Sequence, residues 1–489
     1  MKKKNYTYRL ALSAVLLFVS SFIVLSYAEI KLPAIVSSNM VLQRNAEVKL
    51  WGWAKANEKI SISTSWIKET KKLQADDNGY WSVKLKTTNS KAPQTINITS
   101  KESEIKLDNV LFGEVWLCSG QSNMKQPLKG YNGQPTFGGQ MAIVKADNDN
   151  LRLFSVDRKG SKQPLADVEK FSGWQSASSA NVGDFSAVAY FFGQQLQEKL
   201  DVPVGLIHTS WGGSSVQAWI SDEVMNVYDT VNIDEIDINK RTNRIPTALF
   251  NGMINPLTSY AIKGVLWYQG ESNRNEPENY QKLLPAMVND WRARWGQGDF
   301  PFYFVQIAPF MYGNNNDVFN TVENSAFIRE AQFNCVNLIP NSGIAITMDI
   351  GDDYCIHPPM KKEVADRLLF NALNKTYGYE TIDCEGPVFD KFTEHKGGLL
   401  IDFKHAEMGV FAYDELEGFE LAGEDRVFYP AVATVFKRKQ VLVKSDSVPK
   451  PIAVRYAWRN WVKGTLYDTN LLPASSFRTD NWSDATNSQ

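Results

Sequence analysis

Residues 113–124 read GEVWLCSGQSNM, and this stretch decides the fold because an apolar run passes directly into a polar turn. The apolar part is typical of a strand that is buried on both faces. Gly120 allows the tight turn that exposes the next side chains and their N–H groups. Ser122 is therefore expected at the end of a strand and is the best nucleophile candidate in the chain. The pattern is not a G-x-S-x-G nucleophile elbow, because Met124 occupies the position of the second glycine.

Outward from this stretch, residues 110–378 alternate between short apolar runs and segments with helical spacing. The runs expected as strands are Val204–Ile207, Val265–Tyr268, Phe302–Ile307 and Ile344–Met348. The helical segments carry Tyr280, Leu284, Met287 and Trp291 in one case and Val364, Leu368, Leu369 and Ala372 in the other. We predict an α/β domain with a parallel sheet flanked by helices. Pro285 leaves the start of the first helix undetermined.

The segments on either side read as β structure. In residues 29–109, Trp81, Val83 and Leu85 alternate with polar residues just after the turn signal at 77–79, which predicts a small antiparallel β domain. After Gly378 helical spacing disappears. The strands expected there are Leu399–Phe403, Ala431–Phe436, Gln440–Lys444 and Ile452–Tyr456. Residues 379–489 thus form a C-terminal β region, either a second unit or a return into the first.

Residues 1–28 resemble a targeting segment. Lysines precede an apolar run from Leu10 to Leu25, and Ser26 and Ala28 are small residues at the positions that signal peptidase reads. We predict a cleaved signal peptide and a secreted or periplasmic mature chain. An uncleaved anchor helix is the alternative, because the run is slightly long. No later stretch is apolar and long enough to span a membrane, so no membrane partner is expected after cleavage.

Composition excludes several classes of protein. Of 489 residues, 52 are Lys or Arg and 54 are Asp or Glu, which disfavours a polybasic nucleic-acid-binding protein. The chain is 43% hydrophobic, which disfavours disorder. Its four histidines and the absence of CxxC spacing give no reason to expect a metal or another cofactor. Up to two disulfides are possible, with three pairings open, among Cys118, Cys335, Cys355 and Cys384.

The histidines differ in their surroundings. His357 follows an expected buried strand and precedes a helix, which places it at the carboxyl edge where open α/β sheets build their sites. It is therefore the candidate general base. His208 and His405 lie among strand residues, where structural hydrogen bonds are expected, and His395 resembles a solvated turn.

Two further clusters also follow expected strands. Residues 211–215 read WGGSS, and the paired glycines leave N–H groups available to an anion. Residues 268–273 read YQGESN and add polar side chains to the same edge. Each cluster alone is more commonly a turn with a helix cap. Together the four strand ends carry the parts of an acyl-transfer site: a hydroxyl, an N–H loop, a side-chain amide and a histidine.

These blocks resemble the sialate O-acetylesterase family, which belongs to the SGNH-type hydrolases. The shared motifs, in the family's order, are GQSNM at 120–124, WGG at 211–213, QGESN at 269–273, REAQ at 329–332 and IHP at 356–358. The resemblance covers nearly the whole mature chain, through to Trp482. It implies a three-layer α/β/α esterase core with attached β domains that removes O-acetyl groups from sialic acids without a cofactor.

The resemblance also implies roles for particular residues. Ser122 is implied as the nucleophile and His357 as the base, with an oxyanion hole formed by the N–H groups of Ser122 and Gly213 and an amide of Gln269 or Asn273. Gln121, Asn123 and Glu271 are implied as substrate-binding residues.

One position departs from the pattern of many SGNH enzymes, because Tyr354 stands where they carry the orienting acid. Asp353 is favoured in that role, with Asp352, Asp349 or a Ser-His dyad as alternatives.

Two other functions remain open. An acetyl esterase for another glycan, such as acetylated xylan, would use the same catalytic residues. A non-catalytic glycan-binding protein with this fold is the other alternative, and the presence of both Ser122 and His357 argues against it.

Overall fold

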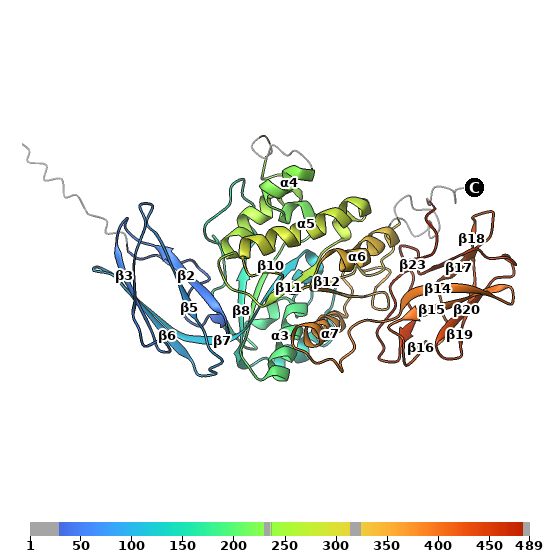
Figure 1. Cartoon of the computed structure of the whole chain (residues 1–489), viewed down its shortest axis with the longest axis horizontal. Helices are drawn as coiled ribbons and strands as arrows, with labels where there is room; N and C mark the ends of the chain where they lie inside the picture. The colour runs from blue at the N-terminus through green and yellow to red at the C-terminus, as the bar shows by residue number, and fades with distance from the viewer. Residues whose placement is uncertain (1–28, 229–234, 236, 313–323, 483–489) are drawn as a thin grey trace, which may run out of the picture.

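The computed structural model describes residues 29–228, 235, 237–312 and 324–482. Figure 1 shows three parts in a row: an N-terminal β domain, a central α/β domain and a C-terminal β region. The predicted signal peptide at 1–28 lies outside the described residues. In the part that the structure describes, no helix is long and apolar enough to cross a membrane.

The central sheet is parallel except at one edge, as predicted. Its strands run in the order β13-β12-β11-β7-β10-β8, with β9 pairing antiparallel to β8. Their bounds are β7 Glu104–Gly120, β8 Asn148–Val156, β9 Gln175–Ala177, β10 Val204–Ser210, β11 Gly264–Tyr268, β12 Phe302–Val305 and β13 Ser342–Ala345. The four predicted apolar runs are β10 to β13, each shifted by no more than three residues.

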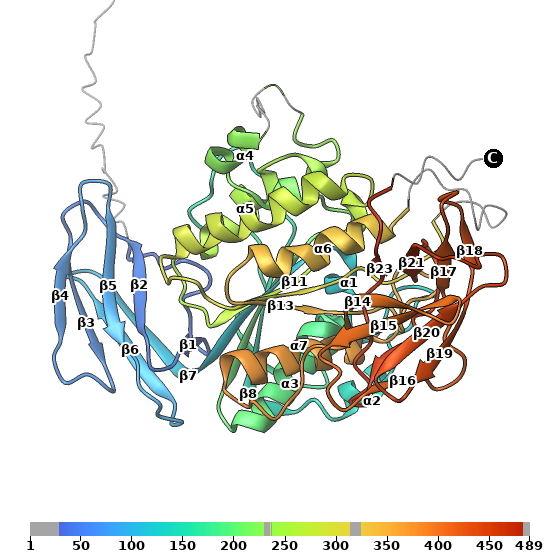
Figure 2. The same ribbon diagram turned by 45° about the vertical axis from the view of Figure 1, so that its right-hand side comes forward.

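Helices cover both faces of this sheet. Figure 2 shows α5 (Pro277–Trp295) and α6 (Ala326–Leu338) on one side, and α3 (Ala187–Leu200) and α7 (Lys361–Asn371) on the other. The two predicted helical segments are α5 and α7. Helix α5 starts at Pro277, where a missing N–H costs nothing, and continues through Pro285. Helix α3 escaped prediction because its first six residues are all buried, so they show no polar face.

Short helices complete the domain. The α-helical ones are α1 Ser122–Lys125, α2 Gly139–Val144 and α4 Asp222–Tyr228. The remaining single turns are η1 Val182–Asp184, η2 Val216–Trp219, η4 Thr242–Arg244, η5 Phe250–Ile254, η6 Asn255–Leu257, η7 Glu271–Asn273 and η8 Ala372–Thr376.

One long strand joins the N-terminal β domain to the central sheet. The first half of β7 pairs antiparallel with β6, and its second half pairs parallel with β10 and β11. The division predicted between residues 109 and 110 therefore falls inside a strand. The other strands of the domain are β1 Val41–Gln43, β2 Glu47–Trp53, β3 Lys59–Thr64, β4 Lys71–Gln74, β5 Tyr80–Lys86 and β6 Gln94–Thr99.

The C-terminal strands pair only with one another among the described residues, so this region is a second β unit. One four-stranded sheet has the order β14-β15-β20-β19 and another the order β18-β17-β21-β23, while β16 pairs with β22. Their bounds are β14 Val388–His395, β15 Gly398–Lys404, β16 Val410–Phe411, β17 Phe419–Ala422, β18 Phe428–Pro430, β19 Val432–Phe436, β20 Gln440–Lys444, β21 Ala453–Tyr456, β22 Tyr467–Asp468 and β23 Phe477–Arg478.

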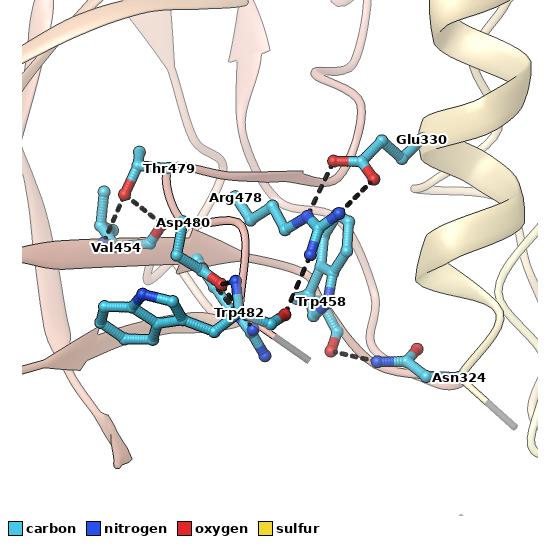
Figure 3. Close-up of polar contacts among 9 residues, drawn as sticks. Asn324, Glu330, Val454, Trp458, Arg478, Thr479, Asp480 and Trp482 are labelled. Carbon is cyan, nitrogen blue, oxygen red and sulfur yellow. Dashed lines mark hydrogen bonds and ion pairs between the residues drawn. The ribbon is translucent and has the colours of Figure 1, made fainter. Parts of the chain in front are cut away.

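Helix α6 attaches this β unit to the central domain. Figure 3 shows the Arg478 guanidinium of β23 bonded to both oxygens of Glu330, at 2.8 and 2.9 Å, and the Asn324 amide donating to the Trp458 carbonyl. Arg329 is fully buried and donates to the Ala457 and Arg459 carbonyls of the β unit. The REAQ motif is therefore, in large part, a docking element.

The four cysteines are free thiols, so none of the three open disulfide pairings is formed.

Candidate active site

Ser122 begins helix α1 at the carboxyl edge of the sheet, directly after β7. The turn depends on Gly120, whose φ is 138° and whose Cβ, if present, would lie 2.2 Å from the Tyr268 carbonyl oxygen. Neighbouring strand ends are tied to it, since Gln121 donates its N–H to the Tyr268 carbonyl and Trp211 donates to the Gly120 carbonyl. The sequence prediction for Ser122 is confirmed in its placement: a half-buried side chain at a strand end.

The paired glycines after β10 lie against this serine. A Cβ on Gly212 would come 3.4 Å from the Ser122 Cβ, and Gly213 has a φ of 69°, in the region that favours glycine. Within the described ranges, the N–H groups of Ser122 and Gly213 have no protein acceptor. Two unused donors beside a serine hydroxyl are what a tetrahedral oxyanion requires.

Tyr131 contacts both Ser122 and His357 and so links the two residues. The Tyr131 hydroxyl donates to the Ser122 carbonyl at 3.1 Å, and its ring packs edge-on against the imidazole with centroids 5.4 Å apart. No hydrogen bond joins the Ser122 hydroxyl to His357 among the described residues. Catalytic hydrogen bonds are commonly long before substrate binds, so this spacing is compatible with a base role.

Gln134 contacts the other side of the imidazole. Its Oε1 lies 2.8 Å from His357 Nδ1. Because an amide oxygen only accepts, the proton resides on Nδ1 and leaves the Nε2 lone pair available. Burial, followed by repulsion from the Lys361 ammonium, lowers the pKa of His357 to about 4. The ring is thus neutral near pH 7, as a base must be.

The candidate carboxylates have other surroundings. Asp353 forms no hydrogen bond or ion pair with any described residue. Asp352 accepts from the N–H groups of Tyr354 and Cys355, and Asp349 pairs with Arg367 at 2.7 Å. None of the three bonds to His357, whose Nδ1 position is taken by Gln134. Sequence reasoning missed Gln134 because it lies 223 residues from the histidine in a segment with only turn signals.

Both amides proposed for the oxyanion hole form hydrogen bonds within the protein. Gln269 donates through Nε2 to the Ser214 carbonyl at 2.9 Å and to Asn273 Oδ1 at 2.8 Å. Asn273 donates through Nδ2 to Gln217 Oε1 and accepts from the Val216 N–H. These contacts join the QGESN loop to the glycine loop. The amides thus help to fix the shape of the site, and the role of Gln269 or Asn273 as an oxyanion donor stays a prediction.

The three residues expected to bind substrate are buried. Gln121 accepts from the Gly270 N–H, and Asn123 donates to Glu271 Oε1 at 2.6 Å. Asn123 also donates to the Ile356 carbonyl at 3.1 Å, next to His357. These contacts place the three side chains behind the reacting edge, where they connect the loops that carry it.

Lys361 completes this connection and was not singled out from the sequence. Its Nζ donates to Asn123 Oδ1 at 2.7 Å and to the Pro358 carbonyl at 2.8 Å. Burial lowers the pKa of Lys361 to about 7 and raises the pKa of Glu271. A charged group aligned in this way, on the first turn of α7, holds the nucleophile turn against the histidine loop.

The other histidines have structural surroundings. His208 is buried with Nε2 2.7 Å from the Ser210 hydroxyl, and burial lowers its pKa to about 3. His405 Nε2 lies 3.1 Å from a Glu385 oxygen, and the His395 ring packs against Phe436.

Comparison with known proteins identifies the family. A family described as carbohydrate esterase, sialic acid-specific acetylesterase, matches residues 112–352. The human protein named sialate O-acetylesterase is 30% identical over 468 residues, covering 87% of each chain. This chain belongs to the sialate O-acetylesterase family. It is accordingly a carboxylic ester hydrolase, and the resemblance stated from its motifs is confirmed.

Other members of the sialate O-acetylesterase family agree over similar lengths. The mouse protein of that name is 27% identical over 509 residues, covering 90% of this chain and 93% of its own. The crystal structure of a carbohydrate acetylesterase from Xanthomonas citri superposes with a TM-score of 0.84 and 34% identity, covering 93% of this chain and all of that one. The likeness therefore extends to both flanking β units.

Proposed function

We propose that this esterase hydrolyses O-acetyl esters of sialic acids, with Ser122 as nucleophile and His357 as general base. The observation that carries the proposal is the pair of unused N–H groups beside Ser122, with a neutral imidazole held next to the same turn. A non-catalytic glycan-binding protein has no need of such an arrangement.

In the proposed reaction, the Ser122 oxygen attacks the acetyl carbonyl carbon while His357 Nε2 takes its proton. The N–H groups of Ser122 and Gly213 stabilise the negative oxygen of the tetrahedral intermediate, at about a hundredfold to a thousandfold in rate per donor. The proton then passes to the departing sugar oxygen. Water attacks the acetyl-enzyme by the same route and releases acetate.

The orienting residue in this proposal is Gln134, in place of the Asp353 favoured from the sequence. Its support is the 2.8 Å contact with His357 Nδ1. A neutral amide fixes the tautomer of His357 but does not stabilise the imidazolium as a carboxylate does. Proton transfer is therefore expected to be less efficient than in a triad with an aspartate.

The architecture and location are part of the same proposal. We assign the central domain to the SGNH-type three-layer fold, from its parallel sheet covered by helices and the order of its motifs. Residues 1–28 are proposed as a cleaved signal peptide of a secreted or periplasmic protein, on the strength of their sequence alone.

Acetylated xylan, the other glycan raised by the motifs, is the competing substrate and would use the same catalytic residues. The Xanthomonas citri relative is described as a carbohydrate acetylesterase, a class that includes both substrates.

The test is acetate release by the chain from Glu29 onward, from 9-O-acetylated sialic acid and from acetylated xylan. Ser122→Ala should lower kcat at least about a thousandfold without changing the melting temperature. Release from xylan alone would reject the sialic acid assignment, and full activity in the serine variant would reject the mechanism.

A further inference from the structure

Arg158 lies at the rim of the active site and has no ion-pair partner in the described part of the chain. It follows β8 at the same carboxyl edge as Ser122, and its side chain is exposed. Among the described residues its guanidinium has no hydrogen bond or ion pair, and its one contact is with the Trp211 ring, 5.9 Å from the centroid. Stacking of this kind orients a guanidinium while leaving its N–H edge open to an anion.

Trp211 fixes this guanidinium relative to the nucleophile. Its N–H donates to the Gly120 carbonyl at 3.0 Å, and the next residue, Gly212, lies against Ser122. The Arg158 guanidinium therefore packs against the same short loop that offers the Gly213 N–H.

The surrounding charges make this corner net positive. Lys125, at the end of α1, has its pKa lowered first by burial and then by repulsion from Arg158, while Asp157 and Asp184 act in the opposite direction. Asp184 is already paired with Lys129. In this set the three cations Lys125, Lys129 and Arg158 outnumber the two carboxylates by one. Such an imbalance favours a bound anion.

We propose that Arg158, held on Trp211, binds the carboxylate of an acidic sugar and gives the esterase its preference for O-acetylated sialic acids. The inference rests on the proposed function, since it needs the acetyl group at Ser122. Sialic acid carries a carboxylate on the same sugar as its acetyl ester, and a neutral acetylated sugar does not. Arginine matches a carboxylate with two parallel hydrogen bonds.

The experiment removes the positive charge of Arg158 and, separately, the negative charge of the substrate carboxylate. Arg158→Gln and wild-type enzyme are assayed on 9-O-acetylated sialic acid and on its C1 methyl ester, which is neutral. The wild type should favour the acid over the methyl ester by about tenfold in kcat/KM, mainly through KM, as for one charged hydrogen-bonded pair at a solvated rim. Arg158→Gln should abolish that preference. The wild-type preference should also shrink at high salt.

Two variants serve as matched controls. Arg244→Gln removes another exposed guanidinium near the glycine loop, whose Nε lies 3.4 Å from the Gly213 carbonyl. Arg426→Gln removes an exposed arginine that stacks on Trp482, 5.3 Å from its ring centroid, in the C-terminal β unit. Both should keep the preference for the acid.

The outcomes separate this inference from the proposed function. Loss of the preference in Arg244→Gln instead, or an unchanged preference in Arg158→Gln, overturns the role of Arg158 while Ser122→Ala still abolishes turnover. If the dependence on Arg158 appears only with acetylated xylan that bears uronic acids, the carboxylate comes from that glycan and the sialic acid part is overturned. Turnover retained in Ser122→Ala rejects the proposed function itself.

Discussion

The edge of the sheet that carries Ser122 and the surface on which the C-terminal β unit docks differ in how far their polar groups are satisfied. At the docking surface, buried Arg329 donates to Ser325, Ser476 and two main-chain carbonyls, and Arg478 meets Glu330 at both oxygens (Figure 3). At the Ser122 edge, two N–H groups have no acceptor among the described residues, and the Arg158 guanidinium has only the Trp211 ring beside it there.

Both regions carry motifs of the same family, so the motif alone does not reveal a residue's role. A buried group whose hydrogen bonds are complete stabilises the fold, because removing it leaves its partners unsatisfied. A donor left open beside a nucleophile adds little to stability and is available to the transition state. Substitutions in the two regions should therefore affect different measurements.

Among the substitutions that test this difference between the two regions, His357→Ala should have the largest effect on activity. Removing the base should lower kcat by about a thousandfold or more, as for other triads. The side chain is only partly buried, so the melting temperature should stay near that of the wild type. Steady-state kinetics and thermal unfolding measure both quantities. Unfolding at a much lower temperature would mean that the histidine is structural.

Arg329→Met should lower the stability of the protein rather than its activity. The guanidinium is fully buried with four protein acceptors, so its loss should lower the free energy of unfolding by about 3 kcal/mol. Urea titration measures the change. Activity per folded molecule should be unchanged. Arg478→Gln, which opens a more exposed ion pair, should cost only about 1 kcal/mol.

Gln134→Ala tests the orienting residue. Loss of the amide that accepts from His357 Nδ1 should lower kcat/KM by about tenfold, one neutral hydrogen bond, with little change in stability. Asp353→Asn is the paired control and should retain full activity, since Asp353 has no partner in the described chain. A larger loss in Asp353→Asn than in Gln134→Ala would restore the aspartate as the third member.

Lys361→Met should have the smallest effect on activity, a shift of the pH profile, although loss of its two buried hydrogen bonds should also lower the melting temperature. The base must be neutral, so kcat/KM falls as pH decreases toward the pKa of His357, at about 4. After burial, the Lys361 charge is what lowers that pKa, so removing it should raise the pKa and move the acid limb to higher pH by less than about one unit. Lys362→Met, at an exposed lysine paired with Asp366, should leave the profile in place. A shift toward lower pH would contradict the assignment.

Much of the fold was predictable because it depends on local patterns. Buried parallel strands are apolar throughout and short, so β10 to β13 stand out, and α5 shows its buried stripe at helical spacing. Helix α3 could not be predicted in this way, because it is buried on too many sides to show an amphipathic pattern. The sequence also did not predict that β7 pairs in two sheets, because the partners of a strand depend on which strands lie beside it in space.

The candidate site divides in the same way. Ser122, His357 and Gly213 follow from residue type and from strand ends that meet at one edge. The hydrogen-bond partners of Gln269, Asn273 and Glu271 could not be predicted. An amide or carboxylate in a loop motif can bind a substrate or can equally well bind a neighbouring loop. Only the packing of the loops shows that these groups already have protein partners.

By itself the sequence determined the order of the β and α/β parts, the turn that carries Ser122, the candidate base His357 and the family. Each depends on residues adjacent in the chain or on motifs in a fixed order. Tertiary structure alone decided that Gln134 contacts His357, that Lys361 joins the nucleophile turn to the histidine loop, and that the Arg158 guanidinium packs on the Trp211 ring. Those contacts join residues far apart in the chain. They exist only because the strand ends of one sheet bring distant loops to the same edge.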